Sequence, residues 1–243
     1  MFLSNGSKRW IKLTIEAYQT QFKQSSPEDL LTFFLKAFSG QIVLASSLGA
    51  EDQVLTDMAL KIDPKALIFV LDTGRLHQET YDVMALTMAT YDMAYDVFFP
   101  DRNSVENLVK EKGPNSFYES IENRKQCCYI RKVEPLNRAL SKNKAWITGQ
   151  RREQSQTRAE LNTVEWDDSH QLIKLNPLAS WTEAQVWDYL KIHDVPFNRL
   201  HKQGYPSIGC APCTRAIKAG EDIRAGRWWW ENPDGKECGL HSK

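Results

Sequence analysis

The sequence predicts an α/β fold built on a doubly wound, mostly parallel sheet. Short apolar runs alternate along the chain with longer segments of helical periodicity. Strands that alternate with helices of this length are typical of a parallel sheet with helices on both faces. A chain of 243 residues, 42% of them hydrophobic, is long enough to bury the core of one large domain.

The expected elements run from residue 10 to residue 192. We expect two helices within 10–40, then helices at 51–62, 77–91, 104–112, most of 118–140, and 182–192. We expect strands at 42–46, 66–71, 95–99, 145–148 and 172–175. The second helix has the clearest start, because Ser26 can serve as its N-cap and Pro27 suits the first helical position.

Composition limits the choice of partners and of compartment. Lys+Arg and Asp+Glu both number 31, so we expect no binding to nucleic acid. No apolar run of about 18 residues is present, and the N-terminus lacks the apolar stretch of a signal peptide. We therefore expect a cytoplasmic protein that does not associate with membranes. A homo-oligomer is compatible with the sequence.

Five cysteines fall into a pattern of four plus one. Cys127 and Cys128 are adjacent, Cys210 and Cys213 form a C-x-x-C pair, and Cys238 stands alone near the C-terminus. A cytosolic chain seldom uses disulfides, so the first four are candidates for zinc or an iron–sulfur cluster. An adjacent pair fits a zinc knuckle poorly, whereas a cluster spreads its ligands over several irons. Four unrelated cysteines remain an alternative.

Polar turns follow three of the expected strands. The first strand leads into Ser46, Ser47, Gly49 and Asp52, where small residues and a helix start suit an anion, although this is not a Walker A loop. The second leads into Asp72, Thr73 and Arg75, which suit a ribose or base edge. Each could also be a plain turn. The fourth leads into Gly149, Arg151, Arg152 and Arg158, and three arginines favour an anionic ligand.

Periodicity fades after about residue 196, where Gly, Pro and Arg accumulate. We therefore divide the chain into N-terminal helices (1–40), a nucleotide-binding α/β domain (41–195) and a C-terminal extension (196–243). The extension is expected to carry the C-x-x-C loop and the tail cysteine, and to fold over the active site.

Seven segments together resemble the assimilatory adenosine 5′-phosphosulfate (APS) reductases, of the family that also includes the 3′-phospho-APS (PAPS) reductases. They run in order from about residue 40 to the end: 46–52, 71–75, 127–136, 148–155, 209–215, 220–231 and 237–241. The cysteine pattern and the Glu237–His241 tail make the combination specific, whereas residues 1–39 contribute little to it.

The resemblance implies an adenine-nucleotide alpha-hydrolase-like domain and a thioredoxin-dependent adenylyl-sulfate reductase, an oxidoreductase that acts on a sulfur group with a disulfide as acceptor. It implies the cleavage of APS to sulfite and AMP in assimilatory sulfate reduction. It also implies a [4Fe-4S] cluster on Cys127, Cys128, Cys210 and Cys213. Enzymes dedicated to PAPS generally lack those four cysteines, so APS is favoured, with PAPS or dual use as the alternative.

A mechanism can be written on this basis as a hypothesis. Cys238 attacks the sulfonate sulfur to form an S-sulfocysteine, and thioredoxin or glutaredoxin then releases sulfite. Candidates for thiolate activation and sulfate binding are His241, Lys132, Arg224 and Arg227. The run Trp228–Trp230 is expected to dock the tail segment by aromatic packing, with a docking face for the thiol partner as the alternative.

Two other classes of protein compete with this interpretation. An ATP-dependent adenylating enzyme would use the turn after the first strand for pyrophosphate, but Leu48 and Glu51 depart from the Ser-Gly-Gly-x-Asp-Ser pattern of such turns. A zinc-stabilised nucleotide-binding module would use the four cysteines structurally. Absorbance near ~400 nm, typical of iron–sulfur centres, would exclude zinc.

Overall fold

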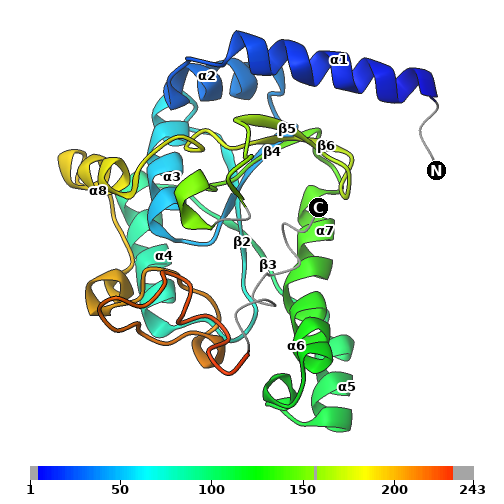
Figure 1. The fold of residues 1–243 in the computed structure, drawn as a ribbon, viewed down its shortest axis with the longest axis vertical. Helices are drawn as coiled ribbons and strands as arrows, with labels where there is room; N and C mark the ends of the chain where they lie inside the picture. Colours follow the sequence, from blue (N-terminus) through cyan, green and yellow to red (C-terminus); the bar gives the residue numbers. More distant parts are fainter. Residues whose placement is uncertain (1–4, 156–157, 232–243) are drawn as a thin grey trace. The chain divides into compact units, whose positions relative to one another are not determined.

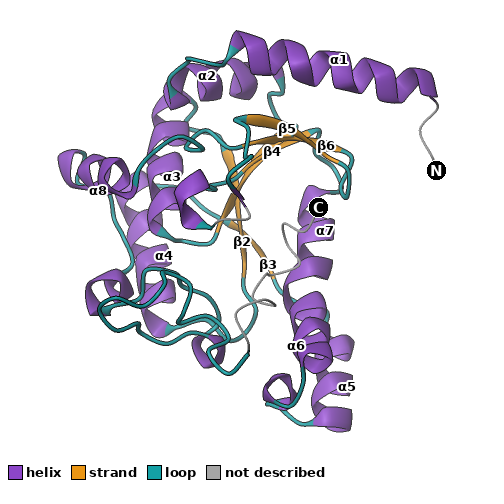
Figure 2. Cartoon of the chain, in the orientation of Figure 1, coloured by secondary structure: helices purple, strands orange, loops and turns teal. Residues whose placement is uncertain are grey.

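The computed structural model describes residues 5–155 and 158–231. These residues form a six-stranded sheet with the order β3-β2-β1-β4-β6-β5, together with helices (Figures 1 and 2). The strands are β1 (Ile42–Ser46), β2 (Leu67–Leu71), β3 (Asp96–Phe98), β4 (Ala145–Ile147), β5 (Val164–Asp167) and β6 (Leu172–Leu175). The helices are α1 (Asn5–Gln21), α2 (Pro27–Ala37), α3 (Ala50–Ile62), α4 (Gln78–Tyr91), α5 (Arg102–Lys112), α6 (Ile121–Cys128), α7 (Glu134–Leu140) and α8 (Glu183–Ile192).

The strand order confirms the predicted fold class. The pairs β1–β4, β2–β3 and β4–β6 are parallel. From β1 the chain moves outward to β2 and β3, then returns to place β4 on the other side of β1. The order therefore reverses between β1 and β4, which is where ligands bind in open parallel sheets.

Local signals explain why several elements begin where they do. Ser26 caps α2 by accepting from the amide of Asp29, whose carboxylate in turn accepts from the Ser26 amide. Thr182 and Gln185 form the same kind of capping box at the start of α8. Asp101 accepts from the amide of Ser104 at the start of α5.

The edge strand β5 was not predicted. It runs antiparallel to β6, with Val164 opposite Leu175 and Asp167 opposite Leu172. Its residues alternate Val-Glu-Trp-Asp, which is a period-2 pattern, but the strand has four residues and two of them are acidic. Pairing with β6 stabilises it as a strand despite that weak signal.

The segment predicted as mostly helical over 118–140 is interrupted. A 3₁₀ turn covers Ser116–Tyr118, α6 follows at Ile121, and a π-helical turn at Tyr129–Val133 separates α6 from α7. Such π turns are frequent at functional sites. The interruption begins directly after the adjacent cysteines.

By the contacts that each part makes within itself, the chain divides into two compact units. Of the described residues, the first unit holds 5–46, 50–68, 142–155 and 158–195. In it, α3 packs on β1, α2 and α8 pack on α3, and α1 packs on β5. The three residues of β4 are buried, and aromatic rings of α1 and α2 pack together, with Tyr18 and Phe34 5.0 Å apart.

Of the described residues, the second unit holds 47–49, 69–141 and 196–231. In it, α7 contacts β3, and α6 contacts the 3₁₀ turn Ser116–Tyr118. A buried cluster of Phe117, Cys213 and Trp228 forms part of its core. The division into 1–40, 41–195 and 196–243 stays a prediction.

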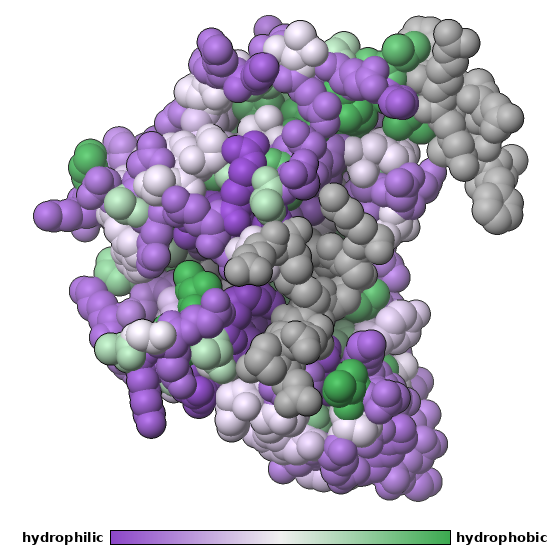
Figure 3. Space-filling view, in the orientation of Figure 1, coloured by the Kyte–Doolittle hydropathy of each residue, from purple (hydrophilic) through white to green (hydrophobic). Residues whose placement is uncertain are grey.

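The surface of the described residues is mostly polar on the face shown in Figure 3, with small separate hydrophobic patches. Scattered exposed apolar residues of this kind are normal for a folded domain. Within residues 5–155 and 158–231, no helix has the length and apolar character needed to cross a membrane.

Candidate active site

Four cysteines meet in one pocket of the second unit. Cys127 and Cys128 are the last residues of α6, Cys210 directly precedes the 3₁₀ turn Ala211–Cys213, and Cys213 is the last residue of that turn. All four line the same pocket, in which Cys213 is buried and the other three are half-buried. The structure thus brings together two cysteine pairs that are more than 80 residues apart in sequence.

Cations surround these thiols. Arg75, Arg131 and Lys132 line the pocket, the last two from the π-helical turn after α6. Arg131 is buried and donates from Nη1 to the carbonyl oxygen of Thr73 at 2.6 Å. Arg75 donates to Asn115 Oδ1 and lies over the ring of Phe117. Positive charge of this kind favours thiolates over thiols.

Burial of the cysteines opposes this stabilisation of the thiolate form. It raises the pKa of the Cys213 thiol to about 12, and Cys210 adds to the rise while Lys132 counters it. Burial also raises the pKa of Cys127, against the effect of Arg131. Burial thus favours the protonated form of Cys127 and Cys213, and binding of a metal would release protons from such thiols.

Within the described residues, no three His, Cys, Asp or Glu side chains form a group that could hold a metal ion. A tetrahedral zinc ion holds its sulfur ligands at about 2.3 Å and so draws them close together. No group of this kind is found in the part of the chain that the structure describes.

The turn after β2 is bound to the C-x-x-C loop. The Oγ1 of Thr73 lies 3.3 Å from Cys210 Sγ, and the carbonyl oxygen of Arg75 accepts from the amide of Ala211 at 2.8 Å. Asp72 Oδ1 accepts from the amide of Gly74 and from the Tyr81 hydroxyl. Burial and this carboxylate raise the pKa of Tyr81 to about 12. The turn therefore supports the cysteine loop directly.

Arg227 supports the same loop from the other side. It is buried, pairs across a bridge with Thr214, and donates from Nη1 to Ser207 Oγ and to the Ile208 carbonyl oxygen. A Cβ on Gly209 would lie 2.5 Å from Arg227 Nη2, so a larger residue at this position would displace the Arg227 guanidinium. The guanidinium also lies over the ring of Trp228, which is fully buried at a φ of 41°.

A second group of predicted residues lies at the carboxyl ends of β1 and β4 in the first unit. The parallel register places Leu44 beside Ile147. Ser46, the last residue of β1, and Thr148, the first residue after β4, therefore lie at neighbouring strand ends. The start of α3 approaches this edge closely. A Cβ on Gly149 would overlap the Asp52 carboxylate and would lie 2.9 Å from Glu51 Cβ. The edge is thus the switch point at which a nucleotide is expected.

The three arginines after β4 have different surroundings. The side chain of Arg151 is 2% exposed and pairs with Glu51 and Glu153 at 2.9 Å and 3.2 Å. Arg152 is exposed and donates from Nε to the carbonyl oxygen of Leu161. Arg158 donates to Gln154 Oε1. Arg151 is therefore part of the protein's own framework, and the other two are nearer to solvent.

Comparison with known proteins identifies the family of the chain. A protein-family model, the phosphoadenosine phosphosulfate reductase domain, matches residues 41–216. The chain belongs to this family. The family that the seven sequence segments indicated is thereby confirmed.

The curated relatives of this reductase-family chain are named adenosine 5′-phosphosulfate reductases. The one from Burkholderia cepacia is 58% identical over 201 residues, covering 83% of this chain and 80% of the relative. The one from Allochromatium vinosum is 52% identical, covering 83% and 79%. The one from Pseudomonas aeruginosa (strain LESB58) is 44% identical over 234 residues, covering 94% and 86%.

Solved structures show the same fold. A phosphoadenylyl-sulfate (PAPS) reductase from Candida auris, in complex with phosphate, has a TM-score of 0.72 and 28% identity, covering 89% of this chain and 99% of its own. An FMN adenylyltransferase from Candida glabrata has a TM-score of 0.56 at 17% identity, covering 92% of this chain and 78% of its own. The second likeness concerns the fold alone.

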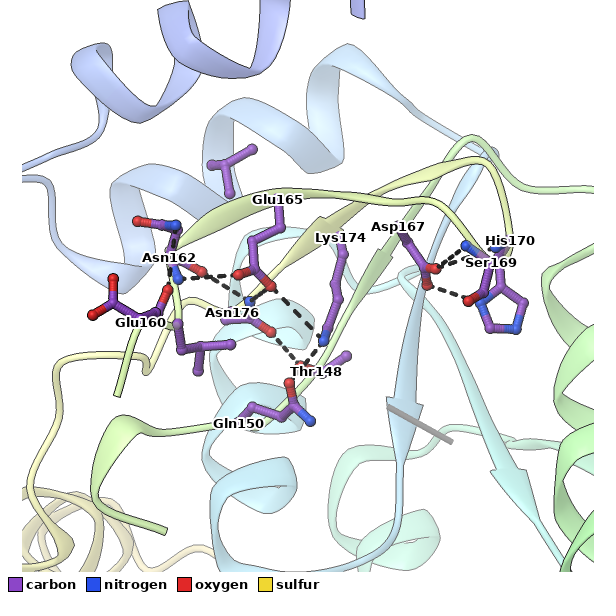
Figure 4. A network of polar contacts seen from close by, with 12 residues as sticks. Thr148, Gln150, Glu160, Asn162, Glu165, Asp167, Ser169, His170, Lys174 and Asn176 are labelled. Carbon is purple, nitrogen blue, oxygen red and sulfur yellow. Dashed lines mark hydrogen bonds and ion pairs between the residues drawn. The ribbon is translucent and has the colours of Figure 1, made fainter. Parts of the chain in front are cut away.

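Sequence reasoning missed a buried polar network in the first unit of this reductase-family chain. Figure 4 shows Lys174, from β6, reaching Gln150 and Glu165, and Asn176 reaching Thr148. Lys174 Nζ lies 2.7 Å from Gln150 Oε1. The network fixes the turn that carries Gly149. A lysine inside the apolar run Leu172–Leu175 was the one available signal.

Sequence reasoning also missed the ion pair between Arg124 and Glu231, which is buried in the second unit.

For the remaining predicted site residues, the structure gives only a few contacts or backbone angles. The Arg224 amide donates to Asp222 Oδ1, and Ser46 is buried. Leu48, within the predicted anion-binding turn, has a φ of 61°, a strained value for leucine. Cys238 and His241 lie outside the described residues.

Proposed function

We propose that the protein reduces adenosine 5′-phosphosulfate to sulfite and AMP, with a small dithiol protein such as thioredoxin or glutaredoxin as the electron donor. One observation carries the proposal: the four cysteines of a chain from this family meet in one pocket beside Arg75, Arg131 and Lys132. The names of the relatives support APS as the substrate. Cytoplasmic location and sulfate assimilation as the biological role are part of the same proposal.

The residues of the pocket fit a [4Fe-4S] cluster. Four thiols are available, and they are not gathered tightly enough for one metal ion. A cluster accepts such spacing because each thiolate binds a different iron. The adjacent cations would offset the negative charge of four thiolates and the cluster. We propose Cys127, Cys128, Cys210 and Cys213 as the ligands.

When bound, the cluster would supply structural and electrostatic support beside the sulfonate, with no change of its own oxidation state. The remaining roles, which are charge compensation and support of the C-x-x-C loop, belong to side chains of the protein itself. Lys132 and Arg131 hold positive charge at the pocket, and the turn after β2 holds the C-x-x-C loop. A cationic wall of this kind lowers the repulsion between sulfonate oxygens and an approaching thiolate.

We propose Cys238 as the nucleophile. Its thiolate forms a bond to the sulfonate sulfur while the bond from that sulfur to the phosphate oxygen breaks, so AMP leaves with the electron pair. A thiolate of the donor then attacks Cys238 Sγ and expels sulfite, and the donor's second thiol resolves the mixed disulfide. Two electrons pass from the donor's two thiols to the sulfonyl sulfur, and the donor ends as a disulfide.

Substrate contacts are proposed separately for the two units. In the first, Ser46, Asp52 and Gly149 stand at the strand-order switch, which suits the nucleotide, while Arg152 and Arg158 are nearer to solvent than Arg151. In the second, we propose the following residues as contacts for the rest of the substrate: Ser47, Gly49, Asp72, Thr73, Arg75, Arg224 and Arg227. His241 is proposed to assist the Cys238 thiolate.

PAPS, or both nucleotides, is the second candidate substrate. The fold it shares with the Candida auris PAPS reductase favours that alternative. Sulfite release from APS and from PAPS, measured side by side with reduced thioredoxin and with iron content recorded, distinguishes the cases. Release from APS alone supports the proposal, and release from PAPS alone contradicts it. Protein without absorbance near ~400 nm would contradict the cluster.

A further inference from the structure

A buried ion pair ties the end of the described chain to the helix that carries two of the cysteines. Arg124 Nε and Nη2 donate to Glu231 Oε1 and Oε2 at 2.9 Å and 2.8 Å, a bidentate arrangement. The two side chains are 1% and 4% exposed. Such a buried pair holds a fixed geometry, because separating the two charges would leave each of them without a partner and without hydration.

Arg124 stands on the same face of α6 as the adjacent cysteines, because it precedes them by three and four residues. It also lines the cysteine pocket, and its guanidinium lies 4.6 Å from the centre of the Trp228 ring. Its charge is matched by Glu231 within the pair. Arg124 therefore binds the segment Trp228–Glu231 through both an ion pair and a cation–π contact.

Neighbouring aromatic contacts hold the same segment. Trp230 packs edge-on against Tyr118 at 4.4 Å and lies 6.0 Å from Phe117. The Glu231 amide donates to the carbonyl oxygen of Trp228. The segment is thus held by a buried charge pair, edge-on and tilted ring contacts and a backbone turn, all within the second unit.

We propose that Arg124 and Glu231 are positioning residues that fix the origin of the C-terminal tail. Cys238 follows Glu231 by seven positions, so a fully extended chain lets it reach at most about 25 Å from that anchor. A fixed, nearby origin raises the effective concentration of a tethered thiol at its target. The inference rests on the proposed role of Cys238 and adds residues that set the reach of that thiol.

The test uses the full-length, iron-loaded protein and a single turnover with APS in the absence of any thiol donor. In Glu231→Gln and Arg124→Lys, we expect the rate constant for sulfo-enzyme formation to fall by roughly ten- to a hundredfold. Iron content should match that of the wild type. APS binding, measured in the Cys238→Ser background to prevent reaction, should change by less than about twofold.

Glu221→Gln is the matched control. Arg215 and Glu221 also form a bidentate pair in the second unit, but their side chains are 35% and 31% exposed and lie off α6. In Glu221→Gln, the rate constant for sulfo-enzyme formation should stay at the wild-type value. Hydrogen exchange at residues 228–231 gives a second measurement, and it should quicken in Glu231→Gln and stay unchanged in Glu221→Gln.

Three outcomes would overturn parts of this account. If the wild type and both variants form sulfo-enzyme equally fast, the inference fails and the proposed function stands. If iron content or APS binding falls in step with the rate constant, the pair is merely structural and the inference also fails. If the wild type itself forms no sulfo-enzyme, the proposed function fails, and the positioning role of the pair falls with it.

Discussion

Gly149 occupies a position with no room for a side chain. The start of α3 lies against it, with the Asp52 carboxylate and Glu51 Cβ where a Cβ would be placed. Glycine is required here by close approach, since its φ is not in the left-handed region. The close approach of α3 to the turn after β4 therefore depends on the absence of a side chain at Gly149.

We expect Gly149→Ala to lower the free energy of unfolding by about 1–3 kcal/mol, because the new Cβ forces α3 away from the strand end. Urea denaturation measures the change. In the double variant with Asp52→Ala the nearest obstruction is gone, so the combined loss should be smaller than the sum of the single losses. A strictly additive result would contradict the steric explanation.

Arg151 shows how a predicted ligand residue can belong to the framework. Its guanidinium is buried and already bound by Glu51, Glu153 and the carbonyl oxygen of Trp181. Removing one partner of a buried pair leaves the other charge without compensation. The sequence showed three arginines after one strand and could not show which of them would be enclosed.

We expect Arg151→Gln to lower the free energy of unfolding by about 2–4 kcal/mol, with Glu51 left partly buried and unpaired. The adjacent Arg152→Gln is the control, since Arg152 is exposed and loses one hydrogen bond, worth about 1 kcal/mol. Thermal or urea denaturation of both variants measures the difference. Equal losses would mean that burial of Arg151 carries no special weight.

At the scale of elements, the sequence predicted most of the sheet because each parallel strand carries its own apolar run and turn signals. The expected strand at 42–46 coincides with β1, and that at 172–175 coincides with β6. β5 was not predicted, because two of its four residues are acidic and weaken the apolar strand signal. Its stability comes from pairing with β6. The π-helical turn was not predicted, because its residues are equally compatible with a continuous α-helix.

The candidate site was predictable in its residue types and unpredictable in its geometry. Cysteine spacing and the resemblance indicated a four-thiol site, and the pocket brings those cysteines together. The ion pair of Arg124 with Glu231 joins residues 107 positions apart, and the pattern around each gives no sign of the other. Contacts of this kind follow from tertiary packing, which local periodicity does not encode.

The C-x-x-C loop depends on a hydroxyl from another element. Tyr118 donates to the carbonyl oxygen of Pro212 at 2.7 Å. We expect Tyr118→Phe to loosen the loop, with a loss of about 1 kcal/mol in unfolding free energy. Iron should therefore be lost faster to a chelator, followed as the decay of absorbance near ~400 nm.

Tyr129→Phe is the control for that experiment, since the Tyr129 side chain is exposed and stands at the start of the π-helical turn. Its rate of iron loss should equal that of the wild type. If Tyr118→Phe also equals the wild type, the hydroxyl does not hold the loop in the loaded protein.

At the scale of the whole molecule, the two compact units hold different groups of predicted residues. The first holds the strand-order switch with Gly149 and Arg151, and the second holds the four cysteines with their cations. Family membership, the fold and the cysteine pocket agree with one another. They are the basis of the proposal that a thiolate attacks a sulfonate, in which the fifth cysteine is the reacting group.

The intact mass of the protein after incubation with APS, without any thiol donor, tests that claim most directly. The wild type should gain the mass of one SO₃ group, located at Cys238 by peptide mapping, and reduced thioredoxin should remove it with release of sulfite. Cys238→Ser should gain nothing while keeping its iron. A sulfonate on another residue, or sulfite release from Cys238→Ser at the wild-type rate, would contradict the account.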